Sequence, residues 1–291
     1  MAGVAPLIVI VGQTASGKSA LALEIAKQIN GEIVCADSRT VYKGMDIGTA
    51  KPNHAEQAEV PHHLLDVVTP SQPFTVVDFT FLAQKAINTI WSKGRWPILV
   101  GGSGLFIDAI IFNYSFGTKA SVHERTLLTK LSIEELQAKL REQGIPIPEN
   151  SKNKRFLIRA LQMKGLLQQK RVLRKNTIVV GLSISKDTLE DKIASRVNDM
   201  VRMGVLDEVR RLSKKYGWDY EPMKSNIYKV LKPVVYQGGT ITEEILEQAK
   251  KADRHLAKKQ LTWFKRNEYV HWGTSQALKK QIASFIKKHS R

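Results

Sequence analysis

The sequence predicts an α/β fold, with a parallel-sheet core, a helical insertion domain and a helical C-terminal region. Short apolar, β-branched runs alternate with helical patterns near the N-terminus. No clear strand pattern occurs between about residues 113 and 176, and helical patterns dominate after residue 182. We therefore expect a core formed by residues 1–112 and 177–291, with the insertion over residues 113–176.

The chain opens with a strand–loop–helix–strand unit. Leu7–Val11 is a continuous apolar run, typical of a buried parallel strand. Apolar residues at helical spacing follow over Ser19–Asn30, and Glu32–Ala36 predicts a second strand that stops at Asp37. The composition of Asp37–Pro73 indicates mostly loop.

A second helix–strand–helix unit completes this first half. Thr75-Val-Val-Asp78 resembles a capping box, and the helix after it is expected to end near Gly94. Pro97–Val100 predicts a third buried strand. The turn Gly101–Gly104 then leads into a short apolar helix, Leu105–Ile111.

The rest of the chain shows mainly helical patterns. Within the insertion, Ser132 caps a helix that ends at Gly144, and Ser151–Lys164 is a strongly basic helix. Thr177–Leu182 is an apolar strand expected to rejoin the first sheet. The remainder is expected to be helical, over Lys186–Met203, Val205–Lys215, a segment around Pro233 and a long basic helix from about Thr242 to Arg266.

Composition limits the class of protein. The formal net charge is +18 over 291 residues, which favours a polyanionic partner such as nucleic acid. The single cysteine, Cys35, excludes an internal disulfide and a multi-cysteine metal site. No apolar run is long enough for a membrane span, and the N-terminus lacks the pattern of a signal peptide. We expect a cytoplasmic protein with no membrane association.

Gly12-Gln-Thr-Ala-Ser-Gly-Lys-Ser19 matches the P-loop pattern G-x-x-x-x-G-K-[ST], with a strand before it and a helix after it. Its backbone N–H groups can form an anion nest, and the N-terminus of the next helix adds positive potential. Lys18 can bind outer phosphates, and the Ser19 hydroxyl can ligate Mg²⁺. The core therefore resembles that of P-loop NTPases, and the loop alone would be read as a nucleotide- or ATP-binding site.

Two features argue against ordinary ATP hydrolysis. The strand Pro97–Val100 is followed by glycines and a serine, where a magnesium-binding acid is usual in such enzymes. Asp37 follows the second strand, so it should face the same crevice as Lys18. A carboxylate there can accept a proton from an attacking nucleophile. Both a small-molecule kinase and a transferase that releases pyrophosphate fit these residues.

Longer motifs resemble the tRNA dimethylallyltransferase (isopentenyltransferase) family. They are the P-loop, the segment from Asp37 to Pro52, His62-His-Leu-Leu-Asp66, Gly101-Gly-Ser-Gly-Leu105 and Ala257-Lys-Lys-Gln-Leu-Thr-Trp-Phe-Lys265. The resemblance implies transfer of a dimethylallyl group from dimethylallyl pyrophosphate to N6 of the adenosine just 3′ of the tRNA anticodon. It also implies that pyrophosphate is the leaving group, that Mg²⁺ is the cofactor and that the target base is flipped out.

The resemblance implies roles for individual residues in the transfer itself. Asp37 would be the base, Lys18 would neutralise the leaving group, and the Ser103 hydroxyl would bind Asp37 or the target base. Ser19 would ligate the metal. The pyrophosphate or nucleotide site would comprise Gly12, Gln13, Thr14, Ala15, Ser16, Gly17, Lys18, Ser19 and Arg196.

Further residues would contact tRNA, and the insertion would hold its anticodon arm. The implied contacts are Asp37, Ser38, Arg39, Thr40, Ser103, Arg155, Arg159, Tyr228, Lys229, Lys258, Lys259, Gln260 and Lys265. Three positions depart from the family pattern. Gln13 replaces a Pro, which would loosen the loop, Thr40 stands where Gln or Leu is common, and Ile227 replaces a Gly.

Three alternatives remain at this level. An adenylate isopentenyltransferase would act on free nucleotides, although the charge of +18 favours tRNA. A nucleoside or small-molecule kinase would use Asp37 to deprotonate a hydroxyl. An RNA-binding module without catalysis would leave Lys18 and Asp37 unexplained. No obligate protein partner is inferred.

Overall fold

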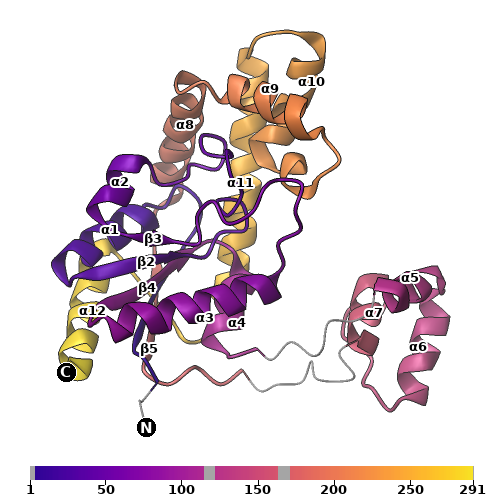
Figure 1. Ribbon diagram of the computed structural model, residues 1–291, viewed down its shortest axis with the longest axis horizontal. Helices are drawn as coiled ribbons and strands as arrows, with labels where there is room; N and C mark the ends of the chain where they lie inside the picture. Colours follow the sequence, from indigo (N-terminus) through magenta and orange to yellow (C-terminus); the bar gives the residue numbers. More distant parts are fainter. Residues whose placement is uncertain (1–3, 115–121, 163–170, 291) are drawn as a thin grey trace. The chain divides into compact units, whose positions relative to one another are not determined.

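The computed structural model describes residues 4–114, 122–162 and 171–290 (Figure 1). The chain divides into two compact units. The larger comprises Met1–Ile111 and Leu173–Arg291, and the smaller comprises Phe112–Val172.

The larger unit is built on a parallel sheet, which confirms the predicted α/β class. Its strand order is β3-β2-β4-β1-β5-β6, and every pairing in it is parallel. The strands are β1 (Leu7–Val11), β2 (Gly31–Cys35), β3 (His62–His63), β4 (Trp96–Gly101), β5 (Thr177–Leu182) and β6 (Val270–Gly273). The register sets Val11 beside Gly101 and Cys35 beside Val100, so β1, β2 and β4 end together.

Helices cover both faces of this sheet, because side chains along each strand point alternately to opposite faces. Helices α1 (Lys18–Gln28) and α12 (Ser275–His289) share an apolar core with one face. On the other face lie α3 (Val76–Ser92) and α4 (Gly104–Ile111), joined by stacking of Phe79 on Phe106. The predicted capping box of Thr75 and Asp78 is present at the start of α3.

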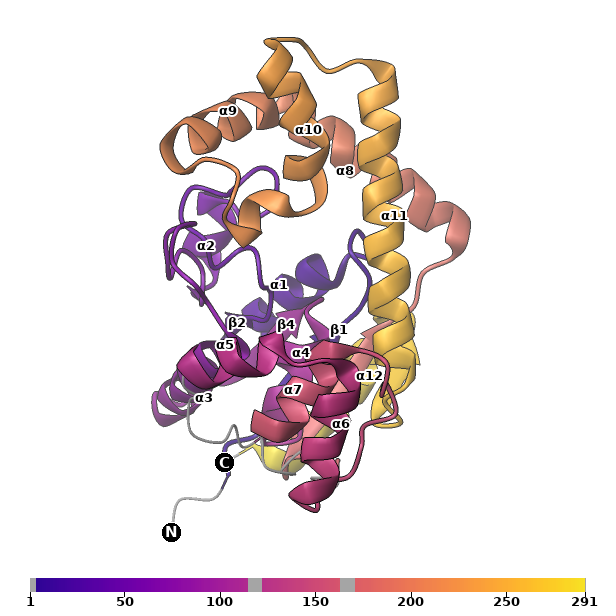
Figure 2. The same cartoon turned by 90° about the vertical axis from the view of Figure 1, so that its right-hand side faces the viewer.

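A second apolar core lies among the helices that follow β5. These are α8 (Lys186–Arg202), α9 (Val205–Tyr216), a short 3₁₀ turn (Glu221–Lys224), α10 (Asn226–Gln237) and α11 (Glu243–Lys265). The loop after β2 contributes Val41, Tyr42 and Met45 to this core. Helix α11 packs against α8 and α10 and also against α4, so it connects this helical core to the helices on the sheet (Figure 2).

The sequence prediction missed some short elements. The region Asp37–Pro73 is mostly loop, as expected, but it also contains helix α2 (His54–Glu59) and the two-residue strand β3. Val270–Gly273, expected to be helical, is strand β6. Both strands are too short to show an alternating pattern, and each forms because an existing strand offers its edge, β2 to β3 and β5 to β6.

The smaller unit is helical where the structure describes it. It contains α5 (Val122–Lys130), α6 (Ile133–Glu142) and α7 (Lys154–Gln162). Leu136, Leu140 and Leu157 form its fully buried centre, and Ser132 caps α6 as predicted. Throughout the described ranges, no helix has both the length and the apolar character needed to cross a membrane.

Candidate functional site

A cavity of about 520 Å³ lies in the larger unit, beyond the carboxyl ends of β1, β2 and β4. This is the edge where open parallel sheets bind ligands. Its wall includes the P-loop, the turn after β2, the segment from Gly48 to Pro52, and one side each of α8 and α11. Lys18, Asp37 and Arg196 all line it, although they come from three separate elements.

The P-loop has the backbone of an anion nest. Ala15 and Gly17 have φ values of 60° and 93°, and α1 begins directly afterwards at Lys18. Left-handed residues alternating with right-handed ones turn successive N–H groups toward one side. The buried hydroxyl of Ser16 has no hydrogen-bond partner among the described residues. Ser16 is not among the residues that line the cavity, but an unpaired buried donor inside such a loop is compatible with a phosphate ligand, which would supply the missing acceptor.

Lys18 is an incompletely paired cation at this loop. Its Nζ donates to the Gln13 carbonyl oxygen at 3.1 Å. The pKa of Lys18 is lowered to about 8, mainly by burial; the Arg196 charge also lowers it, while Asp37 and Asp253 act in the opposite direction. A bound polyphosphate would restore the charged form, since an anion close by favours an ammonium ion.

Helix α8 presents a polar stripe to the cavity. Arg196 forms an ion pair with Asp253 of α11, and its Nη2 donates to the Thr49 carbonyl oxygen at 3.5 Å. Lys192, one turn earlier on the same stripe, also lines the cavity. Within the described ranges it forms no hydrogen bond or ion pair. Sequence reasoning missed Lys192, but its i, i+4 spacing from Arg196 was the available signal.

Asp37 occupies the turn after β2. Its Oδ1 accepts the backbone N–H of Arg39 at 2.7 Å and that of Thr40 at 3.4 Å. No described donor contacts Oδ2, so this second oxygen can receive a proton. The buried hydroxyl of Thr40 also lines the cavity and has no partner among the described residues. Asp37 therefore caps its own turn and still faces the cavity.

Ser103 lies close to this turn but does not bind Asp37. Its Oγ accepts the backbone N–H of Ser38 at 2.9 Å, so the hydroxyl fixes the turn from the side of β4. The residues that line the cavity do not include Ser103. The described residues show no hydrogen bond between Ser103 and Asp37, whose Oδ1 accepts the N–H groups of Arg39 and Thr40.

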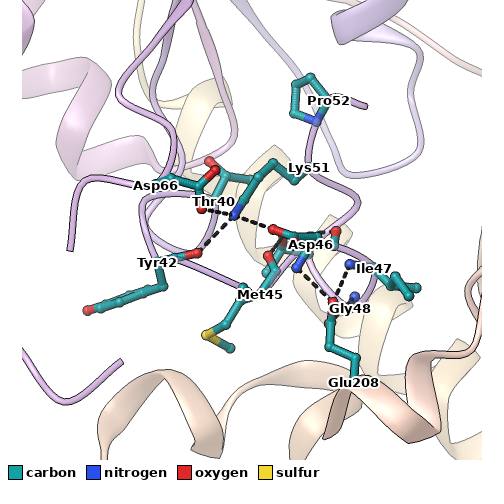
Figure 3. A network of polar contacts seen from close by, with 12 residues as sticks. Thr40, Tyr42, Met45, Asp46, Ile47, Gly48, Lys51, Pro52, Asp66 and Glu208 are labelled. Atoms are coloured by element: carbon teal, nitrogen blue, oxygen red, sulfur yellow. Dashed lines mark hydrogen bonds and ion pairs between the residues drawn. The ribbon is translucent and has the colours of Figure 1, made fainter. Parts of the chain in front are cut away.

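Two charged side chains order the loop between β2 and α2 (Figure 3). Lys51, whose side chain is 3% exposed, binds the Tyr42 carbonyl oxygen and the carboxylates of Asp46 and Asp66. From the other side, Glu208 of α9 accepts backbone N–H groups of the loop at 2.8–2.9 Å, those of Asp46, Ile47 and Gly48. This loop forms the cavity wall from Gly48 to Pro52.

Several residues expected to contact tRNA lie in the interior. Tyr228 is 1% exposed and donates to Glu208 Oε1 at 2.7 Å, and burial raises its pKa. Its ring lies where a side chain at Gly48 would stand, since a Cβ there would come within 2.7 Å of the ring. Gln260 is 9% exposed and binds the P-loop. Ile227, where the sequence departs from the family pattern, is also buried, at 5% exposed within the helical core.

The remaining predicted tRNA contacts are largely on the surface. Lys229, Lys258, Lys259 and Lys265 are exposed in the larger unit, and Arg155 and Arg159 are exposed in the smaller one. Ser38 and Arg39 are partly exposed beside Asp37. Gln13, expected to loosen the P-loop, is buried, and its Nε2 donates to the Ala257 carbonyl oxygen at 3.3 Å.

A divalent cation would depend on few protein ligands here. The described residues contain no group of His, Cys, Asp or Glu side chains arranged to hold a metal ion. Ser19 lines the cavity at the first turn of α1, where its hydroxyl can ligate an ion that also contacts phosphate oxygens. The site therefore fits a metal ion that arrives with a phosphorylated ligand, for which phosphate and water supply most ligands.

Comparison with known proteins gives consistent matches over nearly the whole chain. The family model described as IPP transferase matches residues 40–267. A protein of Bacillus subtilis named tRNA dimethylallyltransferase is 37% identical over 286 residues, covering 92% of this chain and 90% of that protein. One from Geobacillus thermodenitrificans with the same name is 38% identical, covering 91% and 89%.

Solved structures agree with these matches. The full-length tRNA isopentenylpyrophosphate transferase of Bacillus halodurans has a TM-score of 0.75 and 34% identity, covering 98% of each chain. A eukaryotic dimethylallyltransferase acting on tRNA has a TM-score of 0.79 at 22% identity, covering 94% of this chain and 74% of that one. The second match supports the fold alone.

Proposed function

Because the chain belongs to the IPP transferase family, we propose that it transfers a dimethylallyl group from dimethylallyl pyrophosphate to tRNA. The acceptor is N6 of the adenosine adjacent to the anticodon on its 3′ side, and the second product is pyrophosphate. One observation carries this proposal: the P-loop, with Lys18, and the Asp37 carboxylate line the same cavity. The anion-binding loop therefore faces a carboxylate that can accept a proton.

The donor half of the reaction uses the P-loop side of the cavity. The N–H groups of the loop beyond Thr14, the Ser16 hydroxyl and Lys18 would bind the pyrophosphate, and Arg196 would approach it from α8. Asp253 holds the Arg196 guanidinium in place. These groups stabilise the negative charge that grows on the leaving oxygen as the carbon–oxygen bond breaks. We propose Mg²⁺ as the divalent cation, held by Ser19, and it would add positive charge at the same oxygens.

The acceptor half uses the turn after β2. The adenine N6 lone pair attacks the carbon released from oxygen, so a carbon–nitrogen bond forms as the carbon–oxygen bond breaks. N6 then loses one proton, and Asp37 Oδ2 accepts it. The Thr40 hydroxyl is buried and unpaired among the described residues, so it is available to form a hydrogen bond with the target adenine. The base can reach this position only if it leaves its stack in the anticodon loop.

Basic surface residues of both units would hold the tRNA. Lys258, Lys259 and Lys265 lie on the exposed side of α11, and Ser38 and Arg39 lie beside the catalytic turn. We propose that the smaller unit binds the anticodon arm through Arg155 and Arg159 of α7. The net charge of +18 supports such a partner. Given this substrate, we also place the reaction in the cytoplasm.

A direct assay tests this function. Purified protein would be incubated with labelled dimethylallyl pyrophosphate, Mg²⁺ and either total tRNA or AMP. Digestion of the tRNA and mass analysis should then reveal prenylated adenosine. Label transferred to AMP in preference to tRNA would support the free-nucleotide alternative, and phosphate transfer from labelled ATP would support a kinase. Asp37→Asn serves as the matched inactive control.

A further inference from the structure

The P-loop and α11 exchange hydrogen bonds through two glutamine side chains. Gln260 Oε1 accepts the backbone N–H of Thr14 at 2.6 Å. In the opposite direction, Gln13 Nε2 donates to the carbonyl oxygen of Ala257, one turn before Gln260, at 3.3 Å. Both glutamines are buried, at 8% and 9% exposed. Two reciprocal bonds fix the position and the orientation of the loop's first turn relative to the helix.

The buried side of α11 makes this contact possible. Ala249, Asp253, Ala257, Gln260 and Phe264 are its buried residues, at helical spacing along one face. The neighbouring turn after β4 leaves room for the glutamine, because a Cβ at Gly102 would collide with Gln260 Nε2. The exposed side of the helix carries Lys258 and Lys259. Adjacent residues on α11 therefore face different surroundings, Lys259 the solvent and Gln260 the P-loop.

The bond to Thr14 affects which donors remain for a ligand. Because the Thr14 N–H points to Gln260, it is not available to an anion. The unpaired Ser16 hydroxyl and the ammonium of Lys18 lie further along the loop. A loop already held in its bound geometry loses less conformational freedom when pyrophosphate binds. The two glutamine bonds should therefore strengthen binding of the prenyl donor and have little effect on the contacts with tRNA.

We propose that Gln260 is a positioning residue of the donor site, which acts through the P-loop as one half of a Gln13–Gln260 clasp. This assigns Gln260 to pyrophosphate binding, in place of the direct tRNA contact that its surrounding motif suggests. The inference rests on the proposed function, and it adds the route by which α11 shapes the donor site.

The test compares Gln260→Met with its neighbour, Lys259→Gln. Methionine has a similar length but cannot accept the Thr14 N–H. Affinity for inorganic pyrophosphate with Mg²⁺ would be measured by calorimetry, and affinity for a labelled anticodon stem-loop by fluorescence anisotropy. For Gln260→Met we expect pyrophosphate to bind about tenfold more weakly, from loss of one buried hydrogen bond, with stem-loop affinity unchanged. For Lys259→Gln we expect the reverse pattern.

Steady-state kinetics supply a second readout. Gln260→Met should raise KM for the prenyl donor and leave kcat close to the wild-type value, because the loop adopts its bound geometry once the donor is held. Gln13→Met, which removes the other bond, should show the same pattern and replaces Gln260→Met if that variant fails to fold. Circular dichroism melting identifies that case.

Normal pyrophosphate affinity in whichever glutamine variants fold would overturn the clasp. If such a Gln260→Met protein also binds the stem-loop less tightly, Gln260 is a direct tRNA contact instead. If the wild-type protein instead fails to prenylate tRNA, the proposed function is wrong, while the pyrophosphate measurement still decides whether the clasp exists.

Discussion

Tyr228 donates its hydroxyl hydrogen to Glu208 at 2.7 Å, and the same carboxylate accepts three backbone N–H groups from the turn Asp46–Gly48. Four donors thus converge on one buried carboxylate, and each oxygen accepts two of them. The loop they hold forms one wall of the cavity. Glu208 therefore helps to shape the cavity, although no residue of α9 lines it.

Glu208→Ala should lower the free energy of unfolding by about 3 kcal/mol, because buried N–H groups lose their acceptor. Tyr228→Phe should cost only about 1 kcal/mol, since it removes one donor and leaves the carboxylate three others. Urea unfolding measures both changes. Glu244→Ala, at an exposed position of α11, is the control and should change stability by less than about 0.5 kcal/mol. Equal effects of Glu208→Ala and Glu244→Ala would contradict the role of the carboxylate.

Asp37→Asn should reduce kcat at least about 100-fold, because the amide cannot accept the N6 proton. Its oxygen can still accept the Arg39 N–H, so the turn and the affinity for tRNA should be retained. Single-turnover rates and stem-loop binding measure the two effects separately. Asp207→Asn, at a side chain that is 82% exposed on α9, is the matched control. A variant of Asp37 that retained turnover within a few-fold would exclude it as the base.

The lowered pKa of Lys18 predicts a pH dependence of ligand binding. In the free protein the ammonium loses its proton near pH 8, below the usual value of 10.5. Pyrophosphate favours the charged form, so its affinity should fall as pH rises above about 8, and binding there should take up a proton. Calorimetry in buffers with different ionisation enthalpies measures that uptake.

Lys18→Met separates this effect from the titration of pyrophosphate itself, which remains in the variant.

The lowered pKa of Lys18 also has a consequence for the stability of the fold. Below pH 8 both folded and unfolded chains carry the charge, so the folded state bears the full cost of burying it. That cost is relieved between about pH 8 and 10.5, so the contribution of Lys18 to the free energy of unfolding should rise over this window. An identical pH profile for wild type and Lys18→Met would contradict the assignment.

Replacing both Arg155 and Arg159 by Gln should weaken tRNA binding and reduce its dependence on salt. Each lost phosphate contact removes about one unit from the slope of log affinity against log salt. Both side chains are exposed on α7, so the fold of the smaller unit should be unaffected. Pyrophosphate affinity provides the internal control and should stay constant. An unchanged salt slope would place the anticodon arm elsewhere.

Local patterns in the sequence predicted much of the secondary structure correctly. The strands Leu7–Val11 and Thr177–Leu182 were predicted with the bounds that the structure has, because a buried parallel strand is a continuous apolar run. The helix caps at Thr75 and Ser132 were also found from sequence, since a capping box lies within four consecutive residues. Strands β3 and β6 were missed because their pairing partners, not their own composition, stabilise them.

Local sequence patterns identify the chemistry at three strand ends: a P-loop after β1, a carboxylate after β2 and a glycine turn after β4. Parallel strands of one sheet bring these ends together, so the cavity followed from local patterns. Long-range packing sets which polar side chains face that cavity and which support the residues around it. Thr14 and Gln260 are 246 residues apart, and Glu208 is 160 residues from Gly48. Sequence periodicity shows that a helix face is buried, but the partner of a buried polar group is set by long-range packing, because any nearby donor or acceptor can satisfy it.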